Sequence, residues 1–263
     1  MDEVAQTILP VDLNAWLGTP AAPVLIDLRS AQQISADDRL IPGAIRRSPE
    51  DLAARWPELP RGRRVVVLDL AGGESSRLAV EALRRNGLQA SRLDGGFAAW
   101  RRQKLPTRRI IIIAAADDKW VTRERPKIDR IACPWLIRRF INPAAGFLYV
   151  PKSRVLAVAA ETGATPYDVD GVEFTHAGES CSFDAILRIY DLVIPPLDRL
   201  ATIVRGADTS RHDLAPQCGG LIAISRGLSA NFPDDREMLA HGMIIYDALY
   251  AWCRASAAEE RGG

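Results

Sequence analysis

The sequence predicts two domains: an α/β sandwich built on a parallel sheet, followed by a mainly α-helical (α+β) domain. Two short apolar runs rich in β-branched residues, 24–28 and 65–68, indicate strands buried on both faces. A helical pattern over 76–86 follows the second run and stops at Gly87. Because strands and helices alternate here, while helical patterns dominate after residue 119, the sequence favours a layered α/β domain before a helical one.

Composition sets limits on the class of protein. The 263 residues suffice for two domains, and 48% hydrophobic with 25% charged residues is typical of a globular chain. A net charge of +1 gives no whole-chain argument for a nucleic acid or a membrane partner. The longest apolar run, 110–116, is far shorter than the roughly 20 residues of a membrane helix. The first ten residues do not resemble a secretory signal, so we expect a cytoplasmic protein.

The four cysteines are scattered, and all follow residue 130, so the first half has no thiol chemistry of its own. In a cytoplasmic protein such cysteines are expected to be thiols or metal ligands rather than disulfides. They are Cys133, Cys181, Cys218 and Cys253.

The first half carries motifs in a specific order. IDLR (26–29) is followed by IPGAI (41–45), then by a strand that ends at Asp69, a glycine-containing loop and a helix, and last by LDGGFAAW (93–100) and LP (105–106). This series resembles the rhodanese family over residues 1–107. The resemblance implies a three-layer sandwich with a parallel sheet.

The loop that follows the central strand departs from the rhodanese pattern. In the family a cysteine begins this loop, and backbone N–H groups and a helix N-terminus stabilise its thiolate or persulfide. Here Gly72 and Ser75 match, but Asp69 occupies the nucleophile position, Glu74 replaces the usual arginine, and Leu40 replaces the usual histidine. A carboxylate cannot carry a persulfide, so this is not a standard thiosulfate sulfurtransferase.

Two roles remain for the degenerate loop. Asp69 either acts as a nucleophile, as in haloacid chemistry, or accepts N–H groups at the start of the following helix. The second role makes the domain an inactive accessory module for docking or small-anion recognition. Residues 108–118 are expected to link it to the second domain, 119–263, with the apolar middle adding an edge strand or packing on that domain.

The start of the second domain is strongly basic, with seven Lys or Arg and two acids from residue 119 to 139. Pro126 suits a helix start, and Pro134 is expected to remove one backbone hydrogen bond of that helix. On a helical wheel, Asp129 and Cys133 share a face with Leu136. The pattern therefore predicts an aspartate and a cysteine on a buried helix face.

A buried aspartate needs a partner, and two interpretations remain open. In one, Asp129 forms an internal ion pair with an arginine. In the other, Asp129 and Cys133 are candidate catalytic residues of a polar pocket, where Asp129 orients basic groups and Cys133 offers a soft or reducing group. Arginine geometry matches tetrahedral oxyanions, and the candidate oxyanion-binding residues are Lys119, Arg123, Arg130 and Arg138.

A second cluster of polar residues lies between residues 173 and 184, where a strand, a turn and a loop are expected to lead into a helix capped by Ser182. The candidate metal ligands are Glu173, His176, Cys181 and Asp184. Histidine and cysteine suit a divalent transition metal such as zinc or iron. The spacing matches no standard metal motif, so an ordinary structural role for His176 and Cys181 is the alternative.

Several segments together resemble the chromate resistance protein B C-terminal domain over residues 119–254. They are KWVTR (119–123), RPKIDRIACPWLIRRF (125–140), GATPYDV (163–169), His176, CSFD (181–184) and RGADT (205–209). The resemblance implies a role in bacterial tolerance of chromate or related oxyanion stress, beside a chromate efflux system. Family members of that name act as chromate-responsive regulators, but carry a different N-terminal module.

These observations lead to one main hypothesis: an oxyanion- or metal-stress protein whose helical domain binds a small oxyanion, chromate or sulfate-like, or a metal ion. A sulfurtransferase-related enzyme using a cysteine of the second domain is one alternative, and a chromate-responsive transcriptional regulator is another. We expect no membrane partner, because the longest apolar run is short. We also expect no DNA partner, because no helix-turn-helix signature is present. A homodimer is left open.

Overall fold

The computed structural model describes residues 7–111 and 118–262, and the chain divides into two compact units, 1–110 and 111–263. The first two residues of the expected linker, strand β7 (Arg108–Arg109), pair antiparallel with β3 (Arg39–Leu40) inside the first unit. They therefore extend that unit rather than leave it. Most of the apolar middle of the linker lies in 112–117, outside the described residues.

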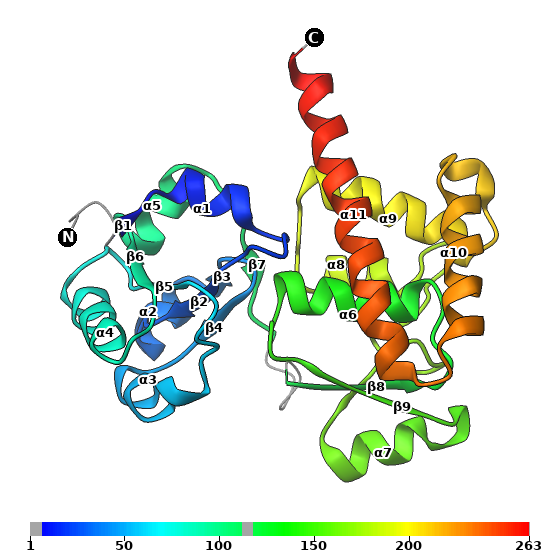
Figure 1. Cartoon of the computed structure of the whole chain (residues 1–263), viewed down its shortest axis with the longest axis horizontal. Helices are drawn as coiled ribbons and strands as arrows, with labels where there is room; N and C mark the ends of the chain where they lie inside the picture. Colours follow the sequence, from blue (N-terminus) through cyan, green and yellow to red (C-terminus); the bar gives the residue numbers. More distant parts are fainter. Residues whose placement is uncertain (1–6, 112–117, 263) are drawn as a thin grey trace. The chain divides into compact units, whose positions relative to one another are not determined.

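The first unit is built on a five-stranded sheet in the order β1-β6-β5-β2-β4 (Figure 1), in which every pairing is parallel. The two central strands are buried along their whole length, as the apolar runs predict. The strands are β1 (Thr7–Ile8), β2 (Val24–Asp27), β4 (Ala44–Arg46), β5 (Val65–Leu68) and β6 (Ala90–Leu93).

Helices cover both faces of this sheet, so the predicted three-layer α/β sandwich is confirmed. Because side chains alternate along a strand, Val66 packs with α1 and α5, while Val67 packs with α3 and α4. The helices are α1 (Pro10–Trp16), α2 (Ala31–Ala36), α3 (Pro49–Arg55), α4 (Glu74–Arg85) and α5 (Gly96–Arg102), with a 3₁₀ turn at Trp56–Glu58.

The apolar residues of α4 do not all face the sheet. Val80 and Leu83 are buried against the sheet, whereas Leu78 is 48% exposed. Two residues correspond to about 200° around a helix, so Val80 and Leu78 cannot face the same sheet. Leu78 instead lines an apolar groove between α3 and α4.

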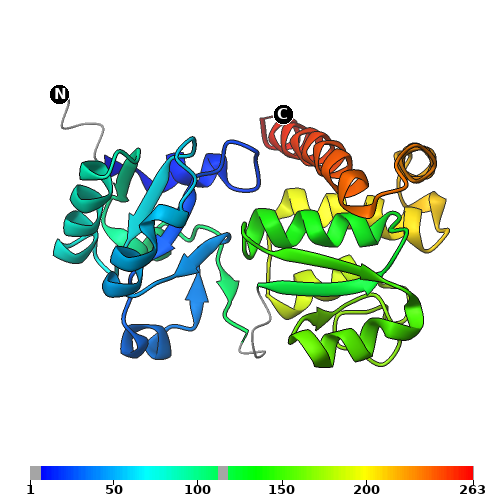
Figure 2. The same ribbon diagram turned by 60° about the horizontal axis from the view of Figure 1, so that its bottom comes forward.

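The second unit combines a small parallel sheet, ordered β10-β8-β9, with a larger set of helices, as Figure 2 shows. One face of β8 carries Trp120 into the main helical core, and the other carries Val121 towards α7. The predicted α+β, mainly helical second domain is confirmed. The elements are β8 (Lys119–Arg123), α6 (Asp129–Phe140), β9 (Gly146–Val150), α7 (Val155–Thr162), β10 (Thr165–Pro166), α8 (Ser182–Ile189), α9 (Pro195–Asp208), α10 (Cys218–Asn231) and α11 (Asp235–Gly262), with 3₁₀ turns at Lys152–Arg154 and His212–Leu214.

Helix α6 is the central helix of this unit, and it begins three residues later than Pro126 suggests. The start is delayed because Ile128 has a positive φ of 43°, which is incompatible with a right-handed helix. From Asp129 onwards the helix is buried around most of its circumference, with Pro134 inside it. The indole N–H of Trp135 donates to Asp247 of α11 over 2.8 Å, which ties the two helices together.

None of the helices in residues 7–111 and 118–262 combines the length and the apolar character needed to cross a membrane.

Candidate metal centre

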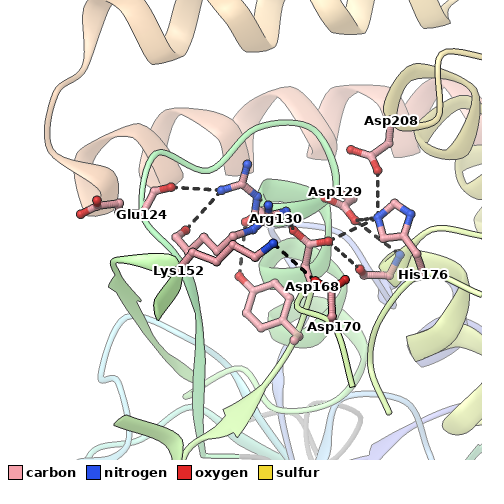
Figure 3. Close-up of polar contacts among 11 residues, drawn as sticks. Glu124, Asp129, Arg130, Lys152, Asp168, Asp170, His176 and Asp208 are labelled. Atoms are coloured by element: carbon pink, nitrogen blue, oxygen red, sulfur yellow. Dashed lines mark hydrogen bonds and ion pairs between the residues drawn. The ribbon is translucent and has the colours of Figure 1, made fainter. Parts of the chain in front are cut away.

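Four side chains of the second unit converge on one point (Figure 3). The Nε2 atom of His176 lies 3.3 Å from Oδ2 of Asp129, 3.3 Å from Oδ1 of Asp168 and 3.2 Å from Oδ2 of Asp208. Asp129, His176 and Asp208 each offer one ligand atom, and these three atoms lie within 4.8 Å of one another. This spacing is compatible with a single metal ion.

Three members of the cluster stand at or just beyond the end of a secondary-structure element, and the fourth lies in a loop. Asp129 is the first residue of α6, and Asp208 is the last residue of α9. Asp168 follows β10 with a positive φ of 54°, and its N–H donates to the carbonyl of Phe174. His176 lies in the loop between that contact and the start of α8. The fold thus assembles the cluster from segments far apart in the sequence.

Asp168 connects the cluster with two arginines. Its Oδ2 accepts from Nη2 of Arg123 over 2.6 Å and lies 3.1 Å from Nε of Arg130. Its Oδ1, which faces His176, also accepts from the Ser182 hydroxyl over 3.2 Å. Figure 3 shows the carboxylate between the guanidinium of Arg130 on one side and the imidazole on the other.

Burial and the neighbouring negative charge disfavour the charged forms of Asp168 and Asp208. Burial, followed by the nearby charge of Asp129, raises the pKa of Asp208 to about 7 and also raises the pKa of Asp168. The hydrogen bond to Asp129 raises the pKa of His176 to about 9 despite partial burial. A single imidazole N–H cannot satisfy three carboxylates, whereas a divalent cation can be bound by several ligand atoms at once, here those of Asp129, His176 and Asp208.

The predicted four-residue basic cluster is only half formed, because Lys119 and Arg138 lie elsewhere. Lys119 and Arg123 stand at opposite ends of β8, which at about 3.3 Å per residue separates them by roughly 13 Å. Arg138 donates to the carbonyl of Ala145 and lies over the ring of Phe147, 5.1 Å from its centroid. Only Arg123 and Arg130 approach the same group.

The predicted metal ligands are also divided, since only His176 belongs to the cluster. Glu173 is exposed on the loop. Asp184 accepts from Arg205 over 2.7 and 2.9 Å, and it also accepts the backbone N–H of Cys181. Cys181, not Ser182, is the N-cap of α8, and its sulfur accepts the N–H of Asp184 in a capping box.

The two cysteines with proposed chemical roles are buried. Cys133 is fully enclosed in the helical core, where burial raises the pKa of its thiol well above the usual value. Burial also raises the pKa of Cys181. Thiolates are the reactive form of cysteine, so these positions favour inert structural thiols.

Sequence reasoning missed Asp168 and Asp208 as site residues. Both lie in segments that carry the family resemblance, 163–169 and 205–209. Their place in these segments is the one sequence signal that marks them. Aspartates so distant in sequence from Asp129 and His176 form no local spacing pattern.

The degenerate loop of the first unit encloses its own carboxylate. Oδ1 of Asp69 accepts from the N–H groups of Ala71, Gly72 and Gly73 over 3.1, 2.6 and 3.0 Å, and Oδ2 accepts from Ser76 N–H over 3.0 Å. Burial opposes the charge, but these hydrogen bonds hold the pKa of Asp69 below its usual range. The Asp69 carboxylate therefore supplies the negative charge that the N–H groups of the loop bind.

The loop is closed by a tight contact with the start of α5. Gly96 has a φ of 59°, and a Cβ there would lie 2.5 Å from the carbonyl oxygen of Asp69. Beside the loop is a cavity of about 890 Å³, whose wall includes Arg46, Arg47 and Glu74.

Comparison with known families divides the chain in the same way as the structure. A rhodanese-like domain model matches residues 9–103, and a model of the ChrB C-terminal domain matches residues 120–253, which is half of the chain. The chain belongs to the ChrB C-terminal domain family. All four members of the cluster lie inside the matched ChrB C-terminal domain.

Individual relatives and solved structures are each similar to part of the chain. Protein ChrB of Cupriavidus metallidurans is 34% identical over 133 residues, which cover 50% of this chain and 40% of the relative. The chain thus spans less than half the length of that ChrB protein. Among solved structures, a full-length protein from Lactobacillus plantarum is 28% identical and covers 41% of this chain and 90% of its own, with a TM-score of 0.38. A rhodanese-related protein from Thermoplasma volcanium is 24% identical over 39% of this chain and 96% of its own, with a TM-score of 0.34.

Proposed function

We propose that the ChrB C-terminal domain of this protein holds a divalent metal ion between Asp129, His176 and Asp208, and serves tolerance of chromate or related oxyanions. The observation that carries the proposal is the position of His176 Nε2, within 3.3 Å of three carboxylates. Three buried or half-buried acids around one nitrogen are costly unless a cation compensates their charge. A metal ion compensates this charge and, unlike a single N–H group, can contact several carboxylates at once.

The donor atoms narrow the choice of metal. Carboxylate oxygens with a single imidazole nitrogen suit borderline or hard divalent ions such as iron, manganese and zinc, whereas soft ions such as copper(I) prefer thiolates. Cys133 and Cys181 supply no ligand to the cluster among the described residues. We therefore expect iron, manganese or zinc to bind more tightly than copper(I).

We propose that the same centre also binds the oxyanion. Three protein ligands leave open coordination positions, and Arg123 and Arg130 lie on the outer side of Asp168. With the metal bound, the ion contributes two positive charges and the two arginines contribute two more, against three negative charges from the carboxylates. The loaded centre then carries a net positive charge, which favours a small dianion such as chromate or sulfate.

Metal titration of the full chain tests the first part of the proposal. After chelation, calorimetry with zinc and manganese should give about one ion per chain, and His176→Gln should weaken binding at least about 100-fold, since loss of even an outer-shell partner costs 10–100-fold. His241→Gln is the matched control, because His241 stacks on Phe232 and does not belong to the group of candidate ligands. No binding by the parent protein, or equal binding by His176→Gln, would refute the metal centre.

Sulfate and chromate titrations test the second part. We expect binding by the metal-loaded protein, much weaker binding by the chelated protein, and a loss of affinity in Arg123→Gln. Arg138→Gln is the control, because that arginine contacts Ala145 and Phe147 instead. Equal oxyanion affinity with and without metal would separate the oxyanion from the proposed centre.

A further inference from the structure

The residue before Asp129 has an unusual backbone conformation. Ile128 has φ 43° and ψ −101°, outside the regions that L-residues normally occupy, and its β-branched side chain makes such a conformation still less favourable. Residues with this kind of strain persist only where the surrounding structure imposes it, and they are concentrated at functional sites. What holds Ile128 is therefore relevant to the cluster that begins one residue later.

Two buried side chains from other helices hold both backbone polar groups of Ile128. The Ser225 hydroxyl on α10 accepts its N–H over 3.0 Å, and the Tyr246 hydroxyl on α11 donates to its carbonyl over 2.8 Å. Ser225 is 3% exposed and Tyr246 is 2% exposed. Neither α10 nor α11 contributes a side chain to the metal cluster.

The conformation of Ile128 determines the position of two cluster members. It directs the first turn of α6, which carries the carboxylate of Asp129. The backbone of Asp129 also favours the charged form of the Asp208 carboxylate and so opposes the rise in its pKa. A change at Ile128 would therefore displace the Asp129 side chain and the backbone group that stabilises the charge of Asp208.

We infer that Tyr246 and Ser225 are positioning residues of the metal centre: they hold Ile128 in its strained conformation so that Asp129 and Asp208 face His176. The inference rests on the proposed metal centre and adds α10 and α11 to its support. It predicts that removing one hydroxyl, without touching any ligand, weakens metal binding and alters the coordination geometry.

The same helix provides a control for loss of packing. Tyr250 lies one turn beyond Tyr246 on α11, is also buried, and packs on the same Trp135 ring with centroids 5.3 Å apart, against 6.3 Å for Tyr246. Tyr250→Phe removes the same atom from the same aromatic cluster. A purely structural contribution of Tyr246 should therefore be reproduced by Tyr250→Phe.

Cobalt(II) is a suitable probe, because its visible absorption reports the coordination geometry. Chelated full-length protein and the Tyr246→Phe, Ser225→Ala and Tyr250→Phe variants would be titrated with cobalt(II), with thermal unfolding measured in parallel. We expect Tyr246→Phe and Ser225→Ala each to lower affinity about 10-fold, as loss of a supporting hydrogen bond does, and to change the absorption bands. Tyr250→Phe should match the parent protein in both.

The outcomes separate the two proposals. If the parent protein binds no cobalt(II), zinc or manganese, the metal centre itself is refuted. If the parent binds and Tyr246→Phe and Ser225→Ala keep its affinity and spectrum, only the positioning role is refuted. An equal loss in Tyr250→Phe would also refute it, because general loosening of the core would then explain the effect. Should Tyr246→Phe fail to fold, Ser225→Ala alone decides.

Discussion

Oδ2 of Asp208 lies 3.2 Å from Nε2 of His176, the nitrogen that would bind the proposed metal ion. The hydrogen bond to Asp129 raises the pKa of His176 to about 9, so the imidazole is protonated at pH 7. A metal ion needs the neutral nitrogen. We predict that each bound ion releases at least about one proton at pH 7, and that affinity increases with pH until about pH 9.

Calorimetry of zinc binding in two buffers with different ionisation enthalpies measures this proton directly. Asp208, with a pKa of about 7, should add a further fraction of a proton at neutral pH. In His176→Gln the larger part of the release should disappear along with most of the affinity. Zinc affinity that is constant from pH 6 to pH 9 would contradict the assignment of His176 as a ligand.

The thiols should be unreactive in the folded protein. Cys133, Cys181, Cys218 and Cys253 are all buried and free. Burial raises the pKa of Cys133, Cys181 and Cys253, so the reactive thiolate is scarce at neutral pH. We predict negligible reaction with an aromatic disulfide reagent at pH 8, and reaction of all four thiols in urea. Rapid labelling of Cys133 or Cys181 in the native protein would revive the hypothesis of a sulfur-carrying cysteine in the second domain.

The sequence predicts most of the architecture because its signals are local. The apolar runs at 24–28 and 65–68 become β2 and β5, and the helical wheel correctly places Asp129 and Cys133 on a buried face. The start of α6 is predicted wrongly because proline preference competes with the strained Ile128, which is held by side chains of the distant helices α10 and α11.

The candidate site is less predictable because it depends on contacts that are distant in sequence. Asp168 and Asp208 reach His176 through the ends of β10 and α9, and no spacing rule relates these elements. Conversely, Lys119 and Arg138 are near Arg123 and Arg130 in sequence, yet strand length and helix orientation separate them. Local charge density therefore overestimates the basic cluster and misses two of the three aspartates around His176.

Asp69 should stabilise the first unit in a pH-dependent way. Its carboxylate accepts hydrogen bonds from the N–H groups of Ala71, Gly72, Gly73 and Ser76. Asp69→Ala removes this acceptor and should lower the free energy of unfolding by about 2 kcal/mol at pH 7. Since the folded pKa of Asp69 is below the unfolded one, this contribution is fully present above about pH 4 and is lost as pH falls through the folded pKa.

Urea unfolding of the full chain from pH 3 to pH 7 checks this behaviour. The difference between the parent protein and Asp69→Asn should be largest near neutrality and should narrow below about pH 4. Asp51→Asn is a control, because Asp51 is an exposed acid of the same unit. A difference that is independent of pH would show that the charge of Asp69 does not stabilise the loop.

The same loop should support sulfur transfer once a cysteine replaces Asp69. The N–H groups that now bind Asp69 surround the position of a persulfide sulfur, and Glu74 stands where an arginine would attract thiosulfate. In Asp69→Cys with Glu74→Arg, the thiolate would attack the sulfane sulfur of thiosulfate and release sulfite. Cyanide would then take that sulfur as thiocyanate and regenerate the thiolate. We expect measurable thiocyanate formation by this double variant.

The parent protein should produce no thiocyanate above the uncatalysed rate, because a carboxylate cannot form a persulfide. Asp69→Ser with Glu74→Arg is the matched control: it restores the positive charge and a small side chain but supplies no sulfur, so it should remain inactive. If the parent protein is active and Cys133→Ser or Cys181→Ser abolishes that activity, the sulfur chemistry belongs to the second unit. If the cysteine variant folds but stays inactive, the loop has lost more than its nucleophile, and the wall of the neighbouring cavity, including Arg46 and Arg47, becomes the next place to change.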